Sequence, residues 1–299
     1  METKQAIQTE IGLSVKQTQV NGTSLNYIEK GSGEAVIFIH GAVSDFRTWI
    51  EQIDAFSENY RAISYSRRFH QPNENVNQTA EYSRLSQAND LIEFVKSLEI
   101  EKAHLVGHSY GASIALIAAV KNPELVASLT LGEPSPFSAL LNETEISFLN
   151  EQKNAFNEAI RLAENGSRES AVRYFLHTVV GVDVLPLLPE ERRIVVLENA
   201  RTLLPMLKNY YDSPRLVCEQ IKGLNIPTLL ITGELSPKIS RVTNQAINRC
   251  LRNSKVEILK GVSHGLQIEN SSGFNRIVSD FLSANKLQSG YDKNSNYKN

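Results

Sequence analysis

Residues 105–116, LVGHSYGASIAL, place Ser109 between two glycines in a mostly apolar run. The five residues from Gly107 to Gly111 match the pattern G-x-S-x-G. They follow a strand-like run and open a helical pattern, which predicts a sharp turn that holds the serine in a strained conformation. Glycines are needed there because neighbouring backbone packs against such a turn, and the amides at the start of the helix favour negative charge beside the serine. We therefore predict that Ser109 is a nucleophile; a plain glycine-flanked turn is the alternative.

A serine hydroxyl needs a base to take its proton, and with this kind of turn the base follows late in the chain. His264 fits, because it lies in the stretch GVSHG just after the last predicted strand and before the last predicted helix. The chain has six histidines. Four others lie at a strand start, in the turn itself, in a helical insertion or in an earlier loop: His104, His108, His177 and His70. We expect His40 to organise its loop.

An acid must orient the imidazole and stabilise its charged form. The usual place follows the glycine after the next-to-last strand, in the stretch TGELSP, but Ser236 stands where an Asp is expected. Another carboxylate, Glu133, leaves a strand at the carboxyl edge of the sheet, where sites of α/β proteins gather. We favour Glu133 as the acid, with Glu234 as the second candidate and a solvated or capping carboxylate as the alternative for Glu133.

The oxyanion formed during acyl transfer needs backbone N–H donors. The pattern predicts the N–H of Tyr110, the residue after the nucleophile, and an N–H from the loop after the first buried strand, for which Ala42 is the candidate. We also place four residues in the substrate pocket, with core packing as the alternative for the tryptophan and the phenylalanine: Gly41, Trp49, Phe137 and Leu266.

Short apolar runs alternate with helical patterns, which predicts an α/β fold with a mainly parallel sheet. A hairpin over residues 14–29 precedes six strand-like runs at 35–39, 61–65, 104–106, 127–131, 228–232 and 255–259. Helical patterns cover 46–57, 80–98, 110–121, 241–251 and 273–284. No strand pattern occurs between 134 and 221, so we predict a core of 1–133 and 222–285, a helical cap of 134–221 and a disordered tail of 286–299.

Composition is that of an ordinary globular protein, with 299 residues, 41% hydrophobic, 21% charged and a net charge of −2. This balance does not suggest nucleic acid or an anionic membrane as partner. No apolar run is long enough to span a bilayer, and the N-terminal residues show no secretory signal. The two cysteines, Cys218 and Cys250, form no metal-binding spacing. We expect reduced thiols in a cytoplasmic protein, and neither a metal nor a cofactor.

The stretch His40-Gly41, the turn at Ser109 and the late His264 together resemble the α/β-hydrolase superfamily over about residues 14–285. The resemblance implies an eight-stranded, mostly parallel sheet with an antiparallel second strand, helices on both faces and a helical cap over the site. An acid after the sixth strand is similar to some haloalkane dehalogenases and fungal-toxin lactonases. Dehalogenases and epoxide hydrolases use Asp as nucleophile, so Ser109 argues against both chemistries.

The loop YSRRFH, residues 65–70, departs from the Asp-x-Arg-Gly pattern common in that superfamily. We expect Arg67 and Arg68 to structure this loop, and the alternative is that one of them faces the pocket.

The leading functional prediction is a serine hydrolase that cleaves an ester or lactone of a small to medium hydrophobic substrate through an acyl-enzyme. The same three residues could instead hydrolyse a carbon–carbon bond beside a ketone, or catalyse cofactor-free perhydrolysis. A non-catalytic ligand-binding protein is the third possibility. We expect a small-molecule substrate as the only partner of a monomer or homodimer.

Overall fold

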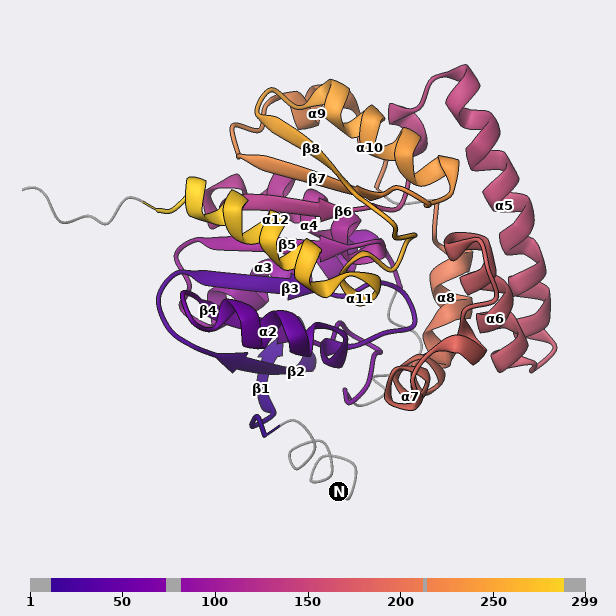
Figure 1. The fold of residues 1–299 in the computed structure, drawn as a ribbon, viewed down its shortest axis with the longest axis horizontal. Coiled ribbons are helices and arrows are strands. Elements are labelled where there is room, and N and C mark those ends of the chain that lie inside the picture. The colour runs from indigo at the N-terminus through magenta and orange to yellow at the C-terminus, as the bar shows by residue number, and fades with distance from the viewer. Residues whose placement is uncertain (1–11, 74–81, 212–213, 288–299) are drawn as a thin grey trace, which may run out of the picture.

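The computed structural model describes residues 12–73, 82–211 and 214–287, which build one eight-stranded sheet flanked by helices (Figure 1). The strand order is β1-β2-β4-β3-β5-β6-β7-β8. The strands are β1 (Lys16–Val20), β2 (Thr23–Lys30), β3 (Ala35–Ile39), β4 (Arg61–Tyr65), β5 (Ala103–His108), β6 (Val126–Gly132), β7 (Thr228–Gly233) and β8 (Ser254–Leu259). The predicted α/β-hydrolase architecture is confirmed.

The sheet is antiparallel at one edge and parallel elsewhere. Strand β2 pairs antiparallel with both β1 and β4, and every later pairing is parallel. Asn21 and Gly22 make the β1–β2 turn with φ of 44° and 72°, the left-handed conformation that a two-residue hairpin needs. Strands β3 and β5 are buried along their whole length, as expected for central strands covered on both faces.

Helices cover both faces of the sheet (Figure 1). Helices α2 (Ile50–Phe56) and α12 (Ser271–Ala284) lie on one face. Helices α3 (Arg84–Ser97), α4 (Tyr110–Lys121) and α10 (Lys238–Cys250) pack on the other. Shorter helices connect these elements: η1 (Phe46–Trp49), η2 (Pro123–Leu125), α9 (Cys218–Lys222) and α11 (Leu266–Glu269).

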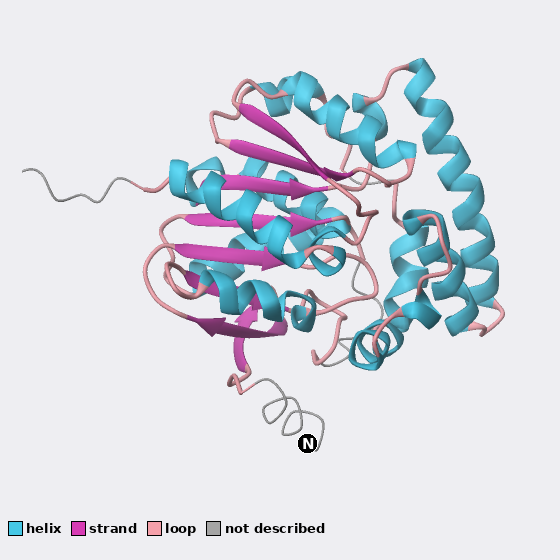
Figure 2. Cartoon of the chain, in the orientation of Figure 1, coloured by secondary structure: helices cyan, strands magenta, loops and turns pink. Residues whose placement is uncertain are grey.

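Between β6 and α9 the described chain contains helices and connecting loops but no strand. These helices lie beside the carboxyl ends of the parallel strands (Figure 2). They are η3 (Ser138–Leu140), α5 (Glu143–Glu164), α6 (Arg168–Val180), η4 (Leu185–Leu187), α7 (Glu190–Glu198), η5 (Ala200–Thr202) and α8 (Leu203–Lys208). We keep 134–221 as the predicted cap. The predicted tail falls almost wholly outside the described residues, which end at 287.

Polar contacts attach these helices to the rest of the fold at several places, two of which lie at opposite ends. The Asn199 side chain donates to Asp45 Oδ2 at 2.8 Å, and Arg47 bridges Asp45 and Glu198. At the opposite end, Glu145 in the first turn of α5 pairs with Arg249 at 2.7 Å. The cap is thus fastened on both sides of the sheet edge that it faces.

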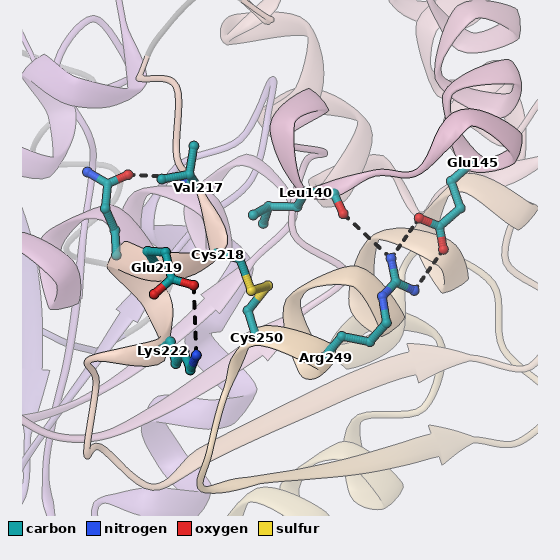
Figure 3. Close-up of a disulfide and its surroundings, with 9 residues drawn as sticks. Leu140, Glu145, Val217, Cys218, Glu219, Lys222, Arg249 and Cys250 are labelled. Atoms are coloured by element: carbon teal, nitrogen blue, oxygen red, sulfur yellow. Dashed lines mark hydrogen bonds and ion pairs between the residues drawn. A yellow bond between two sulfur atoms is a disulfide. The ribbon is translucent and has the colours of Figure 1, made fainter.

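The expectation of reduced thiols is wrong, because Cys218 and Cys250 form a disulfide (Figure 3). Cys218 is the first residue of α9 and Cys250 the last of α10, with Cα atoms 5.1 Å apart across 32 residues of sequence. The pairing follows from the packing of α9 beside α10, which the spacing of two cysteines does not reveal. None of the helices in the described ranges combines the length and the apolar character needed to cross a bilayer.

Candidate active site

Ser109 occupies the turn between β5 and α4, with φ of 53° and ψ of −121°. Positive φ is strained for a residue with a side chain, and such strain is typical of functional sites. The turn is tight because α4 starts directly against β3. A Cβ on Gly111 would lie 2.3 Å from the Ile39 carbonyl oxygen and 2.4 Å from that of His40. Only glycine therefore fits at this position, as the sequence pattern predicts.

The structure brings together the three side chains selected from the sequence. His264 lies in the loop between β8 and α11, and its Nε2 is 3.0 Å from Ser109 Oγ. Its Nδ1 is 2.5 Å from Glu133 Oε2. Since an ionised carboxylate only accepts, Nδ1 carries the proton and Nε2 faces the serine hydroxyl as an acceptor. This is the tautomer that a general base needs.

Glu133 is 1% exposed, directly after β6, and both of its carboxylate oxygens are occupied. Oε2 faces His264, and Oε1 accepts from the Gly233 N–H at 2.7 Å and from the Ser236 hydroxyl. Burial alone would raise the pKa of Glu133, but the hydrogen bonds from His264, Ser236 and Gly233 outweigh it and lower that pKa below its usual value. The carboxylate is therefore ionised at neutral pH.

Ser236, which stands where an acid is usual, forms a hydrogen bond with the candidate acid Glu133. Its hydroxyl donates to the carboxylate that the neighbouring strand provides. Glu234, the second candidate, is exposed and accepts from the Gly261 N–H at 3.0 Å. This contact lies outside the Ser109–His264 pair, whereas Glu133 contacts His264 directly, so the geometry favours Glu133.

The two predicted oxyanion donors border the same site. Ala42 lines the pocket beside Ser109, and the Tyr110 N–H is at the first position of α4, where helical N–H groups lack an intrahelical acceptor. Within the ranges that the structure describes, neither N–H donates to a protein acceptor. The next loop residue, Val43, has φ of 42°, a conformation that is rare for a β-branched residue.

His108, a residue with no predicted role, contacts the loop that carries His264. Its Nε2 is 2.7 Å from the backbone oxygen of His264. Burial and the nearby His264 ring lower the pKa of His108 to about 3. The ring is therefore neutral, and its Nε2–H donates to that carbonyl. The position of His108 inside the Ser109 turn was the only sequence feature that could have indicated a role, and its contact with the His264 carbonyl becomes visible only in the folded chain.

A cavity of about 130 Å³, open to solvent, extends from Ser109 to the helices of the predicted cap. Gly41 and Ala42 form its floor next to the serine. Apolar side chains from α6, from α7 and from the segment between them form the wall opposite the loop of Gly41 and Ala42: Phe175, Leu176, Val179, Val180, Val184, Leu188, Val195 and Val196. The pocket therefore suits an apolar group attached to the reacting carbon.

Three of the four predicted pocket residues do not line this cavity. Trp49 is fully buried and packs against Phe38 and Phe274 on the α2–α12 face. Phe137 is 2% exposed and stacks under Arg84, with 4.4 Å from its ring centroid to the guanidinium. Leu266 is fully buried in the core cluster of the α12 face. Gly41 does line the cavity.

A much smaller cavity of about 20 Å³ lies on the Glu133 side of Ser109 and His264. Its walls include polar side chains from α5, α10 and the residues after α8: Gln152, Tyr210, Ser240 and Thr243. The Thr243 hydroxyl is buried and, among the described residues, has no hydrogen-bond partner. Two cavities of different polarity therefore meet at the serine.

No group of three or more His, Cys, Asp or Glu side chains in the described ranges is placed to hold a metal ion. The family model of the α/β-hydrolase fold matches residues 34–271. The chain belongs to this family, as the fold, the turn at Ser109 and the order of the site residues indicate.

Similar proteins carry several hydrolase names. Monoacylglycerol lipase abhd6-B of Xenopus laevis is 26% identical over 289 residues, which cover 92% of this chain and 83% of that protein. Serine hydrolase BPHL of Mus musculus is 22% identical over 271 residues, covering 88% and 84%. Among solved structures, the enol-lactonase of Burkholderia xenovorans LB400 superposes with a TM-score of 0.73 at 18% identity, covering 90% of this chain and all of the other. The expectation of an α/β-hydrolase enzyme is confirmed at this level.

Proposed function

We propose that this protein is a serine hydrolase that cleaves esters or lactones with an apolar acyl group. The observation that carries the proposal is the continuous hydrogen-bond chain from the Ser109 hydroxyl through His264 to Glu133, with distances of 3.0 and 2.5 Å. In such a chain the imidazole removes the serine proton during attack, and the carboxylate stabilises the resulting charge.

In the first half of the reaction, Ser109 Oγ attacks the carbonyl carbon while His264 Nε2 takes its proton. The N–H groups of Ala42 and Tyr110 bind the oxyanion, and the protonated imidazole then gives its proton to the leaving oxygen. In the second half, His264 removes a proton from water, which attacks the acyl-enzyme, and Ser109 regains its hydroxyl.

The two cavities support different roles in the reaction. The large apolar cavity suits the acyl group, because burying each methylene contributes about 0.8 kcal/mol. We assign the smaller cavity to the attacking water, since it borders His264, offers hydroxyl and amide groups, and has a volume of about 20 Å³, which suits a molecule of that size. The names of the lipase and enol-lactonase relatives are consistent with this class of substrates.

The test is a panel of p-nitrophenyl esters from acetate to decanoate, together with simple lactones. We expect kcat/KM to rise about fourfold per methylene, the equivalent of 0.8 kcal/mol, until the apolar cavity is filled. A carbon–carbon bond hydrolase would instead act on a diketone and leave the esters intact, and a perhydrolase would require hydrogen peroxide.

Covalent labelling with a fluorophosphonate tests the nucleophile directly. We expect labelling of the wild type and none of Ser109→Ala. Ser113→Ala is the matched control, because Ser113 is a fully buried serine of α4 that donates to the Ser135 carbonyl and lies outside both cavities. A folded wild type that resists labelling and hydrolyses no member of the panel would refute the proposal.

A cytoplasmic location is a separate proposal. It was predicted with reduced thiols, whereas disulfides such as Cys218–Cys250 persist mainly in oxidising compartments. Trapping thiols with an alkylating reagent during cell lysis, followed by mass spectrometry, decides the matter. Free thiols on both cysteines would support the cytoplasm, and an intact disulfide would exclude an ordinary reducing compartment.

A further inference from the structure

Arg67, two residues after β4, is 1% exposed and lies behind the loop that carries Ala42. Among the described residues, no carboxylate lies within ion-pair distance of its guanidinium. A buried charge without an opposite charge is costly unless hydrogen bonds satisfy it. The contacts that satisfy Arg67 therefore indicate what its charge does.

The guanidinium binds two consecutive carbonyl groups of the oxyanion loop. Its Nε donates to the His40 oxygen at 3.1 Å, and its Nη2 donates to the Gly41 oxygen at 2.7 Å. The third nitrogen, Nη1, donates to the Gln87 side chain. The charge is thus directed at the peptide groups immediately before Ala42.

His40 provides a second hydrogen-bond donor to the Gly41 carbonyl. The Arg67 backbone N–H donates to His40 Nε2 at 3.0 Å, so this nitrogen is an acceptor and the proton lies on Nδ1. His40 Nδ1 in turn lies 2.9 Å from the Gly41 oxygen and donates to it. The Gly41 carbonyl therefore accepts one charged and one neutral hydrogen bond.

The Gly41–Ala42 peptide bond is trans, since the one cis bond in the described residues is Gln71–Pro72. In a trans peptide the C=O and N–H point in opposite directions. With the Gly41 oxygen held by Arg67 and His40, the Ala42 N–H faces away from them, and Ala42 lines the cavity at Ser109. Hydrogen bonds to the carbonyl of a peptide also strengthen its N–H as a donor.

We propose that Arg67 is a positioning residue that orients and polarises the Gly41–Ala42 peptide, so that its charge reaches the oxyanion through the Ala42 N–H. This inference rests on the proposed acyl-transfer function. Arg67 also contacts the residue that carries the other donor, because its Cζ lies 5.2 Å from the centroid of the Tyr110 ring. One side chain thereby contacts the loop that carries one donor and the ring of the residue that carries the other.

Arg68 provides a matched comparison. It is the adjacent arginine, also buried, but its guanidinium pairs with Asp90 instead of the loop carbonyls. Replacing both members of that pair by Arg68→Gln with Asp90→Asn removes a neighbouring buried charge pair without leaving one charge alone. Whatever its effect on stability, this double variant leaves the contacts of Arg67 with the His40 and Gly41 carbonyls in place.

The experiment compares Arg67→Gln and Arg67→Lys with that double variant. The substrate is p-nitrophenyl butyrate, and the inhibitor is butaneboronic acid, which forms a tetrahedral adduct with Ser109 that mimics the reaction intermediate. Because the oxyanion exists only after attack, its stabilisation affects kcat more than KM. We expect Arg67→Gln to lower kcat and the affinity for the boronic acid about tenfold each, with KM within about twofold. Arg67→Lys keeps the positive charge but cannot donate to both loop carbonyls from a planar group, so its kcat and boronic acid affinity should lie between those of Arg67→Gln and wild type.

The control double variant should keep kcat and boronic acid affinity within about twofold of wild type. Equal losses in the Arg67 and Arg68 variants, or a loss confined to KM, would overturn the inference. A wild type that neither hydrolyses the ester nor binds the boronic acid would instead refute the proposed function.

A measurement on the wild type keeps the test independent of variant folding. Labelling with carbonyl-¹³C glycine and ¹⁵N alanine selects the two Gly–Ala peptide bonds of the chain, 41–42 and 111–112. With two donors on its oxygen, the Gly41 carbonyl should resonate downfield of ordinary glycine carbonyls, and the Ala42 amide proton should move downfield when butaneboronic acid binds. An ordinary Gly41 carbonyl shift would contradict the contact on which the inference depends.

Discussion

Replacing Glu133 by Gln is the sharpest test of the catalytic geometry, because the structure dictates how the amide must sit. The oxygen position Oε1 accepts from the Gly233 N–H and the Ser236 hydroxyl. The amide oxygen must therefore take that position, and the amide nitrogen faces His264. An amide N–H can only donate, so His264 Nδ1 becomes an acceptor and the imidazole proton moves to Nε2, where it faces Ser109. In that tautomer the imidazole cannot accept the serine proton.

The expected loss follows from two contributions. Restoring the active tautomer sacrifices the new hydrogen bond and sets two N–H groups against each other, which together costs about 2–3 kcal/mol. The imidazolium also loses a charge-assisted bond to a fully buried carboxylate, worth about 1.5–3 kcal/mol. Together these predict a fall in kcat of about 10³–10⁴-fold, in line with the loss of about 10⁴-fold when the equivalent Asp of a serine protease is replaced by Asn.

The assay is steady-state hydrolysis of p-nitrophenyl butyrate, with active sites counted by fluorophosphonate labelling and folding checked by thermal unfolding. Glu234→Gln is the control, since Glu234 is exposed and, in the part of the chain that the structure describes, its carboxylate accepts only from the Gly261 N–H. We expect it to change kcat less than about twofold. If Glu133→Gln kept a tenth of the wild-type kcat, or if both variants lost activity equally, the assignment of the acid would be wrong.

Three further predictions concern stability. The folded pKa of His108 is about 3 against 6.5 when unfolded, so the unfolded chain binds more protons between these values and stability falls as pH drops below 6.5, by up to about 1.4 kcal/mol per pH unit. His108→Gln should flatten urea-unfolding free energies by that slope between pH 6.5 and 4, and equal slopes would contradict its buried neutral state. Removing the disulfide by Cys218→Ser with Cys250→Ser should cost about 3–4 kcal/mol for a loop of this length, which a denaturant midpoint unaffected by the change would rule out. Gly111→Ala should prevent formation of active, folded enzyme, whereas Gly223→Ala should behave as wild type in thermal unfolding, since a Cβ there meets nothing closer than 3.8 Å.

Features coded by local periodicity could be predicted from the sequence. The buried strands appear as continuous apolar runs, and the turn at Ser109 is recognisable from its glycines and from its position between a strand and a helix. The end of a parallel strand also marks the edge of the sheet where Glu133 meets His264. These inferences needed only the place of each residue along its element.

Predictions that needed the direction of a side chain were less successful. Trp49 follows the oxyanion loop in sequence, but η1 turns its ring into the α2–α12 face. The partners of Cys218, His108 and Arg67 lie 32, 156 and 26–27 residues away. No spacing rule relates such pairs, because their contact depends on how loops and short helices pack after the sheet has formed.

The site concentrates backbone strain at one edge of the sheet. Four non-glycine residues with positive φ follow the four adjacent strands β4, β3, β5 and β6: Phe69, Val43, Ser109 and Glu133. Each such residue costs about 1–3 kcal/mol, so together they offset a large part of the 5–15 kcal/mol by which a domain is usually stable. The strain persists because these strands are buried and their register is fixed on both sides. A rigid edge of this kind holds Ser109, Glu133 and the loop that carries Ala42 in place for the proposed reaction.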